Sequence, residues 1–403
     1  MTINFILMVL NEALIHFSGI ILNFALSWHV LNVTQSVEVF ATMLAISAFP
    51  IILAKPFGGV VADRFSKKKL IISCNLLNAL ITFRLGMLLL NGSTSVFKIG
   101  VAITFISLIS TIYNPSVMAS LPNILSPEKL LKGNGIIQGV NAFSAIGGPL
   151  LAGYFYRYLN ISTFVFICTI IYGIAAINSL FIQIPNQKKN KNKEEIQTMF
   201  DELKEGFNEI LNKEPMLLQF ALGLSLIVMI YQAVASVALP YLISYSFNLQ
   251  EEYFGFAQAG VGIALLLGSL AVGTKIFQRR LKLEFTPMWV NVIGILSIPF
   301  IIAVSPFFNL NAFSRYFLFT MLLIGIMFVF SIVNILFMVT IQETIPAQNL
   351  GKTIAILSAI ISIAVPIGQI LISLALNHLI ILFAIIPVIT FLIPTVMLKN
   401  KKF

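Results

Sequence analysis

The chain has 403 residues, of which 58% are hydrophobic and only 10% are charged. A soluble domain cannot bury so much apolar surface, so the composition excludes a soluble protein and indicates an integral membrane protein. The net charge of +10 comes from short basic turns between long apolar runs, which is typical of cytoplasmic loops and argues against a nucleic-acid partner.

Signatures of catalysis and of cofactor binding are missing from the sequence. The two cysteines, Cys74 and Cys168, lie inside apolar segments, so they predict neither a disulfide framework nor a metal site. No phosphate-binding Walker loop and no Ser–His–Asp setting is recognisable. We therefore expect no enzyme activity, no ATP drive and no cofactor.

Twelve apolar segments are each long enough to cross a bilayer, which takes about 20 helical residues at a rise of about 1.5 Å per residue. Their apolar runs are too long, and alternate too little, to be strands. The sequence therefore predicts an all-α membrane protein with twelve transmembrane helices. In chain order they span residues 4–31, 38–62, 70–91, 97–121, 134–157, 160–184, 215–245, 253–276, 287–306, 313–341, 352–376 and 379–398.

Basic residues assign the loops to the two sides of the membrane. If the turn after residue 62 is cytoplasmic, all but five of the 25 Lys and Arg residues face the cytoplasm. Only Lys98, Arg157 and Arg315 then lie outside, while Lys55 and Arg84 fall within helices. This asymmetry follows the positive-inside rule and puts both termini in the cytoplasm. We expect Arg84, in the outer half of its helix, to snorkel towards the membrane surface and not to bind a ligand.

The chain divides near its middle. A lysine-rich linker follows Pro185 and leads into a segment, 194–213, whose apolar residues recur every three or four positions. Such an amphipathic helix is expected to lie along the inner membrane face as a brace, or alternatively to bind a partner. We predict an N-terminal six-helix bundle, 1–185, a cytoplasmic linker with this helix, 186–214, and a C-terminal six-helix bundle, 215–403.

The two halves repeat each other weakly, with an offset of about 220 residues. Pro127–Lys132 recurs as Pro346–Lys352, and the Gly148-Pro149 pair recurs as Pro366 with Gly368. Prolines and glycines in membrane helices can also coincide by chance. Together with the helix count, the matches favour two related bundles of a transporter.

The turn after the second predicted helix has the form Gly59-x-x-Ala62-Asp63-Arg64-x-x-Lys67-Lys68. This pattern resembles the signature loop between helices 2 and 3 of the major facilitator superfamily. Further resemblances lie in residues 114–128, 202–206 and 342–352. Within the superfamily, the chain is most similar to the drug exporters that include bacterial macrolide efflux proteins.

The resemblance implies a twelve-helix secondary transporter of the bacterial inner membrane, which we expect to be a monomer. Four residues of the fifth helix resemble the glycine–proline motif of antiporters in this superfamily: Gly147, Gly148, Pro149 and Gly153. One departure matters. The middle of the fourth helix, 106–110, carries no arginine where drug antiporters usually place one, so the resemblance supplies no proton-coupling site.

The loop after the second helix predicts a conformational latch. The resemblance implies that Asp63 meets the start of the eleventh helix, where a carboxylate gains about 0.3–1 kcal/mol, or up to ~2 kcal/mol when partly buried. About 1.4 kcal/mol is a tenfold population change, enough to bias alternation between two states. Alternatively, the basic residues only fix the topology. The predicted latch residues are Gly58, Gly59, Asp63, Arg64, Lys67 and Lys68.

The first helix carries a polar stripe that includes Glu12, His16 and Asn23. Glu12 lies about 12 Å in from the helix start, and a charge at that depth costs several kcal/mol unless it is paired or hydrated. One hypothesis is that Glu12, assisted by His16, binds and releases the coupling proton. The alternative is a static ion pair with Lys55, about 10 Å into the second helix.

Sparse polar residues on other helices are candidates for a substrate cavity. The resemblance implies that helices 1, 4, 7 and 10 surround such a cavity, although isolated Ser and Thr residues in membrane helices often bond to a backbone instead. Few polar groups among Phe, Met and Leu suit a bulky amphipathic ligand. The candidates are Asn23, Ser107, Thr111, Asn114, Gln232, Ser331, Asn334 and Met338.

The expected function is proton-coupled export of hydrophobic, drug-like compounds of the macrolide type by alternating access. Its partners would be a small-molecule substrate, protons and the lipid bilayer. The alternatives are an exporter or flippase of an endogenous product, such as a siderophore or a lysolipid, and a non-transporting membrane sensor on the same scaffold.

Overall fold

Helices are the only regular elements in the part of the chain that the computed structural model describes. The described residues are 3–92, 95–184, 211, 214–272, 286–304, 309–345 and 350–398, without the side chains at some positions within them. The predicted linker, 186–214, lies outside this part except for residues 211 and 214. The expectation of an all-α protein is confirmed.

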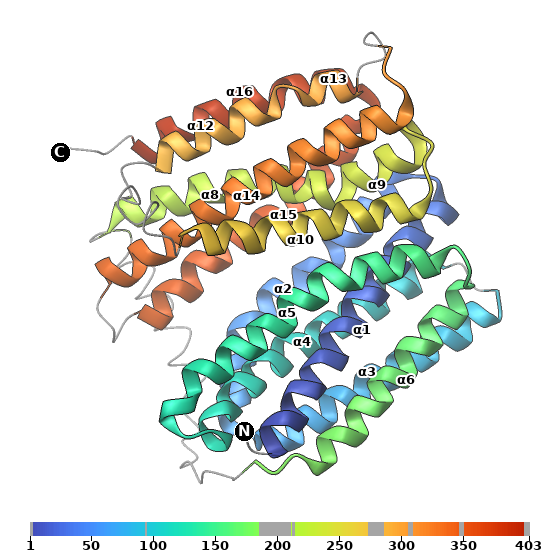
Figure 1. Cartoon of the computed structure of the whole chain (residues 1–403), viewed down its shortest axis with the longest axis vertical. Coiled ribbons are helices and arrows are strands. Elements are labelled where there is room, and N and C mark those ends of the chain that lie inside the picture. Colours follow the sequence, from blue (N-terminus) through green and yellow to red (C-terminus); the bar gives the residue numbers. More distant parts are fainter. Residues whose placement is uncertain are drawn as a thin grey trace. The chain divides into compact units, whose positions relative to one another are not determined.

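Two compact units divide the chain. Unit 1 comprises Met1–Lys191 with Glu251–Ala259, and unit 2 comprises Asn192–Gln250 with Gly260–Phe403. The first six helices of unit 1 agree with the six predicted spans of the N-terminal half (Figure 1). They are α1 (Ile3–Thr34), α2 (Val37–Arg64), α3 (Lys67–Leu90), α4 (Val96–Ile124), α5 (Pro127–Tyr156) and α6 (Ile161–Phe181).

The other six predicted spans also coincide with helices. One span is built from α8 (Pro215–Ala233), a π-helical turn (Val234–Ala238), α9 (Leu239–Tyr241) and a second π-helical turn (Leu242–Ser246). The others are α10 (Glu251–Val272), α12 (Thr286–Ser297) with α13 (Phe300–Val304), α14 (Ala312–Thr344), α15 (Leu350–Ala375) and α16 (Leu379–Leu398).

Two prolines account for the irregular spans. Pro240, in α9, has no N–H to donate, and the helix widens into π-helical turns on both sides of it. Pro299 stands at the break between α12 and α13. Among the described residues, nine helices are apolar over a full membrane thickness. Shorter apolar stretches, Val37–Ile52 and Leu379–Ile393, lie in α2 and α16.

Helix ends are fixed by ordinary capping. The Ser36 side chain accepts a hydrogen bond from the Val39 N–H at the start of α2, and Asn311 does the same for Ser314 at the start of α14. Pro127 and Pro215 open α5 and α8, where a missing N–H costs nothing.

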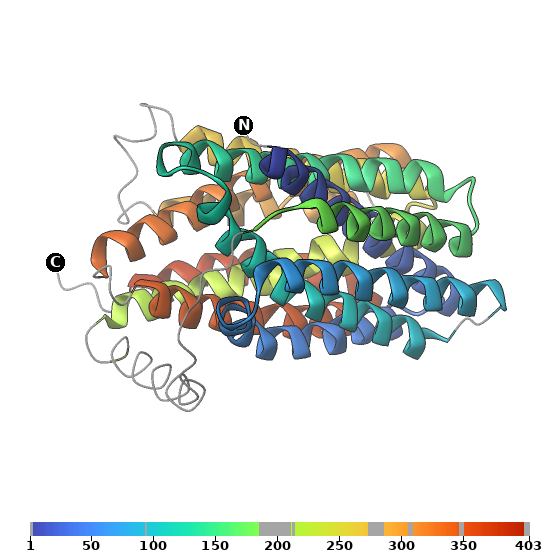
Figure 2. The ribbon, with the colours of Figure 1, turned by 90° about the horizontal axis from the view of Figure 1, so that it is seen from below.

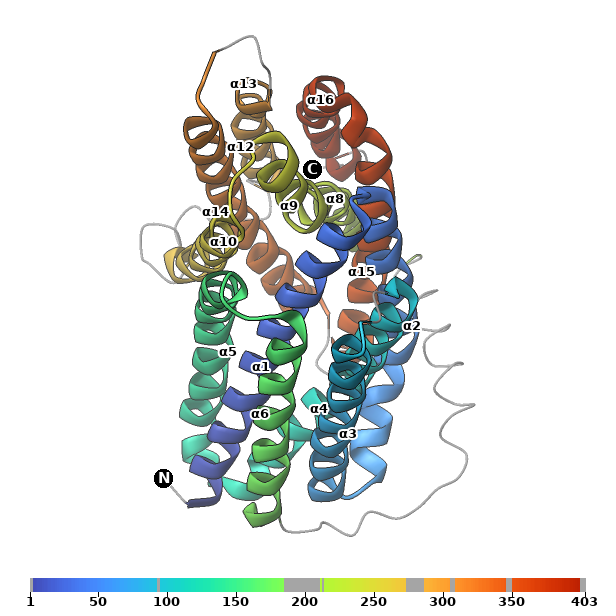
Figure 3. The same ribbon diagram turned by 90° about the vertical axis from the view of Figure 1, so that its right-hand side faces the viewer.

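Within unit 1, the closest helix pairs are α3 with α6, α2 with α4, and α1 with α5 and α6. Figure 2 shows α1 (dark blue) beside α6 (green), as does Figure 1. Figure 3 shows α3 next to both α4 and α6. The helix α1 therefore packs mainly against α5 and α6, with smaller contacts to α2 and α4.

Two glycines let helices of unit 1 pack closely, Gly58 against a backbone and Gly148 against a side chain. A Cβ on Gly58 of α2 would collide with the backbone carbonyl of Thr111 on α4. A Cβ on Gly148 of α5 would lie 2.7 Å from Ile20 Cγ2 on α1. Small residues of this kind let membrane helices approach until their backbones touch.

Unit 2 repeats both contacts. A Cβ on Gly268 of α10 would lie 2.5 Å from the carbonyl oxygen of Phe328 on α14. A Cβ on Gly368 of α15 would collide with the carbonyl of Met229 on α8. The second and fourth helices of each half, and the first and fifth, thus meet at glycines. The weak sequence repeat has a structural counterpart.

We expect Gly58→Ala to lower the stability of the protein by about 1–3 kcal/mol, because the added methyl group overpacks the contact between α2 and α4. The measurement is thermal unfolding of the detergent-solubilised protein. Gly173→Ala on α6 is the matched control, since a Cβ there meets nothing within 4 Å and alanine improves helix propensity. Equal stability of the two variants would contradict the packing argument.

Candidate functional site

A buried carboxylate is the most unusual group in unit 1. Glu12 of α1 is only 1% exposed. Its Oε2 accepts a hydrogen bond from the hydroxyl of Tyr113 on α4 at 3.0 Å, and its Oε1 lies 3.0 Å from His16 Nε2 one helical turn later. Both carboxylate oxygens are therefore paired, which offsets much of the cost of burying the group in apolar surroundings.

Within the cluster of Glu12, His16 and Tyr113, the side chains differ in their exposure to solvent. Tyr113 is 1% exposed, whereas the side chain of His16 is 27% exposed. The partly exposed His16 therefore connects the buried carboxylate to a more accessible position on the same helix.

Tyr113 was not among the residues predicted from sequence. It lies between the candidates Thr111 and Asn114 in an apolar helix, where its spacing does not distinguish it from core packing. The available signal is general: a buried tyrosine hydroxyl usually finds a hydrogen-bond partner. The sequence cannot say which partner, because Glu12 is 101 residues away.

The predicted alternative partner of Glu12, Lys55, has its side chain outside the described residues. The static Glu12–Lys55 pair therefore stays a prediction. The pairing of Glu12 with His16, in contrast, is directly seen.

The polar stripe of α1 continues towards an exposed amide. A Cβ on Gly19 would lie 3.4 Å from the hydroxyl oxygen of Tyr172 on α6. One turn further, Asn23 is exposed and accepts a hydrogen bond from the Ser27 hydroxyl at 3.4 Å. The stripe thus runs from a buried acid to an exposed amide on one face of the helix.

The other faces of α1 are tied to α3 and α6 by hydrogen bonds. Asn75 of α3 donates to Asn11 Oδ1 at 2.9 Å and to the Ala175 carbonyl of α6 at 3.3 Å. Asn178 of α6 donates to the Leu7 carbonyl at 2.8 Å. Consecutive helical residues point about 100° apart. While Asn11 faces α3, its neighbour Glu12 is consequently turned towards α4.

The predicted cavity residues on α4 have different environments. The Thr111 hydroxyl donates to the Leu108 carbonyl of its own helix at 2.7 Å, and the Ser107 carbonyl accepts from Ser110 at 2.6 Å. Asn114 is exposed. Of these three candidates, Asn114 has the side chain most available to a ligand.

The candidates of unit 2 also divide into two groups. The Ser331 hydroxyl of α14 donates to the Leu265 carbonyl of α10 at 2.8 Å, beside the close contact at Gly268. Gln232 of α8 and Asn334 and Met338 of α14 are exposed. Ser331 therefore holds two helices together, whereas the other three side chains are accessible.

Of the predicted latch, Gly58 makes the α2–α4 contact described above. Lys68 of α3 donates from its Nζ to the Leu180 carbonyl at 2.9 Å, near the C-terminal end of α6. A cation there satisfies a free carbonyl and the helix dipole. Lys67 is the first residue of α3 and is partly exposed.

The side chains of Asp63, Arg64 and Lys352, and the surroundings of Gly59 and Gly351, lie outside the part that the structure describes. The latch therefore stays a prediction. Lys68 has a structural role within unit 1 whether or not the latch exists.

The glycine–proline motif of α5 contributes close contacts. Gly147 lies next to Phe17 of α1, and Gly148 faces Ile20, as described above. Within unit 1, a Cβ on Gly153 would lie 3.2 Å from the Cα of Gly255, and a Cβ on Gly255 would lie 2.5 Å from the Pro149 carbonyl oxygen. Each residue of the motif thus faces a packed neighbour.

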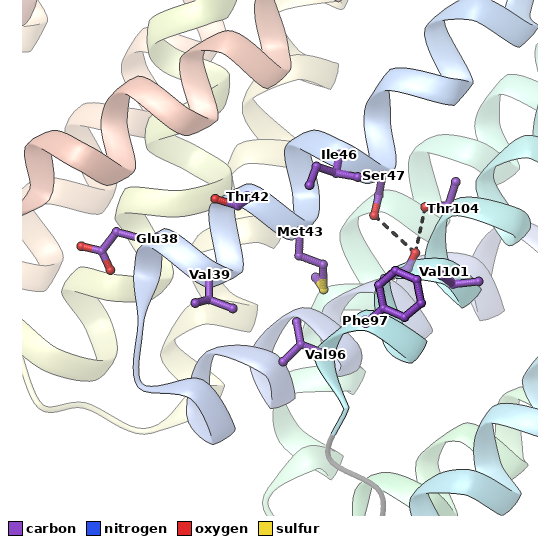
Figure 4. Close-up of a pocket in the computed structure, with 11 residues that line it drawn as sticks. Glu38, Val39, Thr42, Met43, Ile46, Ser47, Val96, Phe97, Val101 and Thr104 are labelled. Carbon is purple, nitrogen blue, oxygen red and sulfur yellow. Dashed lines mark hydrogen bonds between the residues drawn. The ribbon is translucent and has the colours of Figure 1, made fainter.

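A cavity of about 400 Å³ lies between α2 and α4, away from the Glu12 cluster (Figure 4). Its walls are mainly apolar, and Glu38 lies at its edge. The hydroxyls of Ser47 and Thr104 both donate to the Gly100 carbonyl, at 3.4 and 2.8 Å. These two hydroxyls are thus engaged with the backbone of α4.

Among the described residues, no group of three or more His, Cys, Asp or Glu side chains could hold a metal ion.

Comparison with known proteins identifies a family and several relatives. The sequence profile of the Major Facilitator Superfamily matches residues 8–369. Macrolide efflux protein A of Streptococcus pyogenes is 23% identical over 275 residues, or 68% of this chain and 67% of that protein.

A second relative matches a smaller region. Lysophospholipid transporter LplT of Photorhabdus laumondii is 26% identical over 131 residues. The match covers 32% of this chain and only 31% of that transporter.

Solved structures share the fold at low sequence identity. A bacterial homologue of the iron transporter ferroportin, in an inward-facing state, has a TM-score of 0.73 and 16% identity, with 99% of both chains covered. The nucleoside transporter NupG has a TM-score of 0.72 and 16% identity, covering 98% of this chain and all of that one.

The burial of Glu12 leads to a prediction about Tyr113. Tyr113→Phe removes a hydrogen bond to a carboxylate and should cost about 1.5–3 kcal/mol, whereas a neutral hydrogen bond contributes about 0.5–1.5 kcal/mol. The matched control is Tyr231→Phe in α8, which is equally buried and whose hydroxyl meets Thr390 at 2.8 Å. Thermal unfolding in detergent compares the two, and a smaller loss for Tyr113→Phe would argue against an ionised Glu12.

Proposed function

Because the chain belongs to the major facilitator superfamily, and is therefore a membrane transporter and not an enzyme, we propose that it exports hydrophobic, drug-like compounds in exchange for protons. The observation that carries the proton coupling is the buried Glu12 carboxylate, paired with His16 and Tyr113. Ionisable residues at membrane depth belong to functional sites by default.

Glu12 serves as the proton carrier in this proposal. An ionised Glu12 is stabilised by the Tyr113 hydroxyl and by a protonated His16. When a proton neutralises the carboxylate, the charge-assisted part of both interactions is lost. The two protonation states thus favour different contacts between α1 and α4, which is the differential interaction that alternating access requires.

The substrate is a bulky amphipathic molecule in this proposal. Asn23 and Asn114 are the accessible polar candidates of unit 1, and Gln232 and Asn334 are those of unit 2. A few hydrogen-bonding groups among apolar side chains fix the orientation of a hydrophobic ligand without demanding full hydration. The similarity to macrolide efflux protein A favours a macrolide-type substrate.

Lysolipid translocation is the second candidate. The match to lysophospholipid transporter LplT favours it, and a lysolipid is itself a bulky amphipathic molecule. The same polar groups would contact its headgroup.

We also propose a location in the bacterial inner membrane, which the similarity to bacterial transporters favours, and cytoplasmic termini, which the basic loops favour. We further propose that the protein works as a monomer and that residues 58–68 act as its latch.

Glu12→Gln tests the proton coupling directly. Glutamine keeps the shape and the hydrogen-bond acceptor but cannot titrate, so proton-driven substrate accumulation in inverted vesicles should be lost while substrate exchange without a gradient persists. Glu38→Gln, at the start of α2, is the control and should behave like the unaltered protein. An unchanged pH dependence in Glu12→Gln would rule out Glu12 as the carrier.

Expression in a pump-deficient bacterial host distinguishes the substrates. We expect reduced susceptibility to macrolides and hydrophobic cationic dyes, because the exposed polar candidates suit such ligands, and collapse of the proton gradient should abolish the effect. The susceptibility of the host to each compound is the measurement. Unaltered susceptibility to every compound, with lysolipid translocation in reconstituted vesicles, would replace drug export by the second candidate.

A further inference from the structure

A groove between α3 and α4 combines apolar walls with two cations. The groove has a volume of about 410 Å³ and lies entirely within unit 1. Arg84 of α3 and Lys98 of α4 both line it, and both side chains are exposed. The remaining lining is apolar and includes Leu80, Phe97 and Phe105.

Arg84 and Lys98 face the same groove without an acidic partner in the part of the chain that the structure describes. The other two outer cations already interact with the protein. Arg315 donates to the carbonyls of Ala303 and Val304 at 2.8 and 3.0 Å, and Arg157 lies over the ring of Tyr158. Two neighbouring positive charges at the edge of an apolar region are costly unless an anion joins them.

The two cations lie at the outer end of the groove. Arg84 lies about 9 Å before the end of α3, and Lys98 about 3 Å after the start of α4. Leu80 and Phe105 lie deeper, about 6 Å beyond Arg84 and about 10 Å beyond Lys98. The groove is therefore charged near the membrane surface and apolar towards the bilayer centre.

We propose that this groove binds an anionic phospholipid, with the phosphate between Arg84 and Lys98 and an acyl chain along the apolar walls. With the basic loops in the cytoplasm, the lipid belongs to the outer leaflet. Arginine binds phosphate through two parallel hydrogen bonds, and lysine adds a second positive charge. In this proposal Arg84 binds a ligand together with Lys98, which differs from the expectation that Arg84 only snorkels.

The adjacent cavity between α2 and α4 shows why the ligand is an anion. Phe97 and Val101 of α4 line both spaces. The charged residue that lines the cavity between α2 and α4 is Glu38. Both charged residues that line the groove between α3 and α4 are basic. The two spaces therefore have similar apolar walls but charged residues of opposite sign. The groove between α3 and α4 selects a negative headgroup. The site is independent of the proposed substrate and of proton coupling.

The test uses the full chain, purified in detergent, with fluorescent phosphatidylglycerol as the probe and phosphatidylcholine as the neutral comparison. The double variant R84Q/K98Q should bind phosphatidylglycerol about 30-fold more weakly, since each basic residue near an anionic lipid contributes about 1 kcal/mol. R84K/K98R, which keeps both charges, should retain most of the affinity. R157Q, which removes an outer cation away from the groove, should bind like the unaltered protein.

Three outcomes would overturn the proposal. In the first, R84Q/K98Q binds phosphatidylglycerol as tightly as the unaltered protein does. In the second, the unaltered protein binds phosphatidylcholine as tightly as phosphatidylglycerol. In the third, inorganic phosphate alone displaces the lipid. A salt titration of the unaltered protein provides a check that needs no variant. Affinity for phosphatidylglycerol must fall as salt rises, because screening weakens exposed charges.

Discussion

Helices in a bilayer gain no hydrophobic free energy by associating, because lipid tails are as apolar as their side chains. Everything else in this protein depends on how its helices nevertheless hold together. The answer in each unit is the same: glycines lie at the helix contacts. Gly58, Gly268 and Gly368 meet the backbone of a neighbouring helix, and Gly148 meets the Ile20 side chain. Interhelical hydrogen bonds from asparagines add to these contacts.

This mode of packing limits where charge can lie. In unit 1, α1 packs against α5 and α6 and also contacts α4, so a carboxylate on its inner face must find partners on those helices or on α1 itself. Glu12 finds Tyr113 and His16. The carboxylate is thereby held by a hydroxyl from α4 and by an imidazole from its own helix, and this pairing is the basis of the proposed proton coupling.

The positions of the helices could be predicted from sequence because bilayer thickness sets the length of an apolar segment. All twelve predicted spans coincide with helices, and the pairing of Glu12 with His16 follows from spacing of four residues on one helix. Contacts between distant helices could not be predicted in this way. Tyr113 resembles a core residue in sequence, and nothing near Lys68 indicates that its partner is a carbonyl of α6.

Arg84 and Lys98 likewise show that a shared site cannot be predicted from single residues. Arg84 considered by itself is a cation that reaches the surface, and Lys98 considered by itself is an exception to the positive-inside rule. Their shared groove follows from the antiparallel packing of α3 against α4, a tertiary property that no local pattern records.

The contacts of unit 1 connect the proposed proton site to the predicted latch. α1 is held by Asn11, Ser18 and their partners on α3 and α6, and Tyr113 is the residue through which α4 contacts Glu12. From Tyr113, two residues along α4 lead to Thr111, whose carbonyl touches α2 at Gly58. Gly58 begins the stretch that contains Asp63. At this contact two backbones meet directly, with no side chain between them that could change rotamer. A rearrangement of α4 would therefore have to move α2.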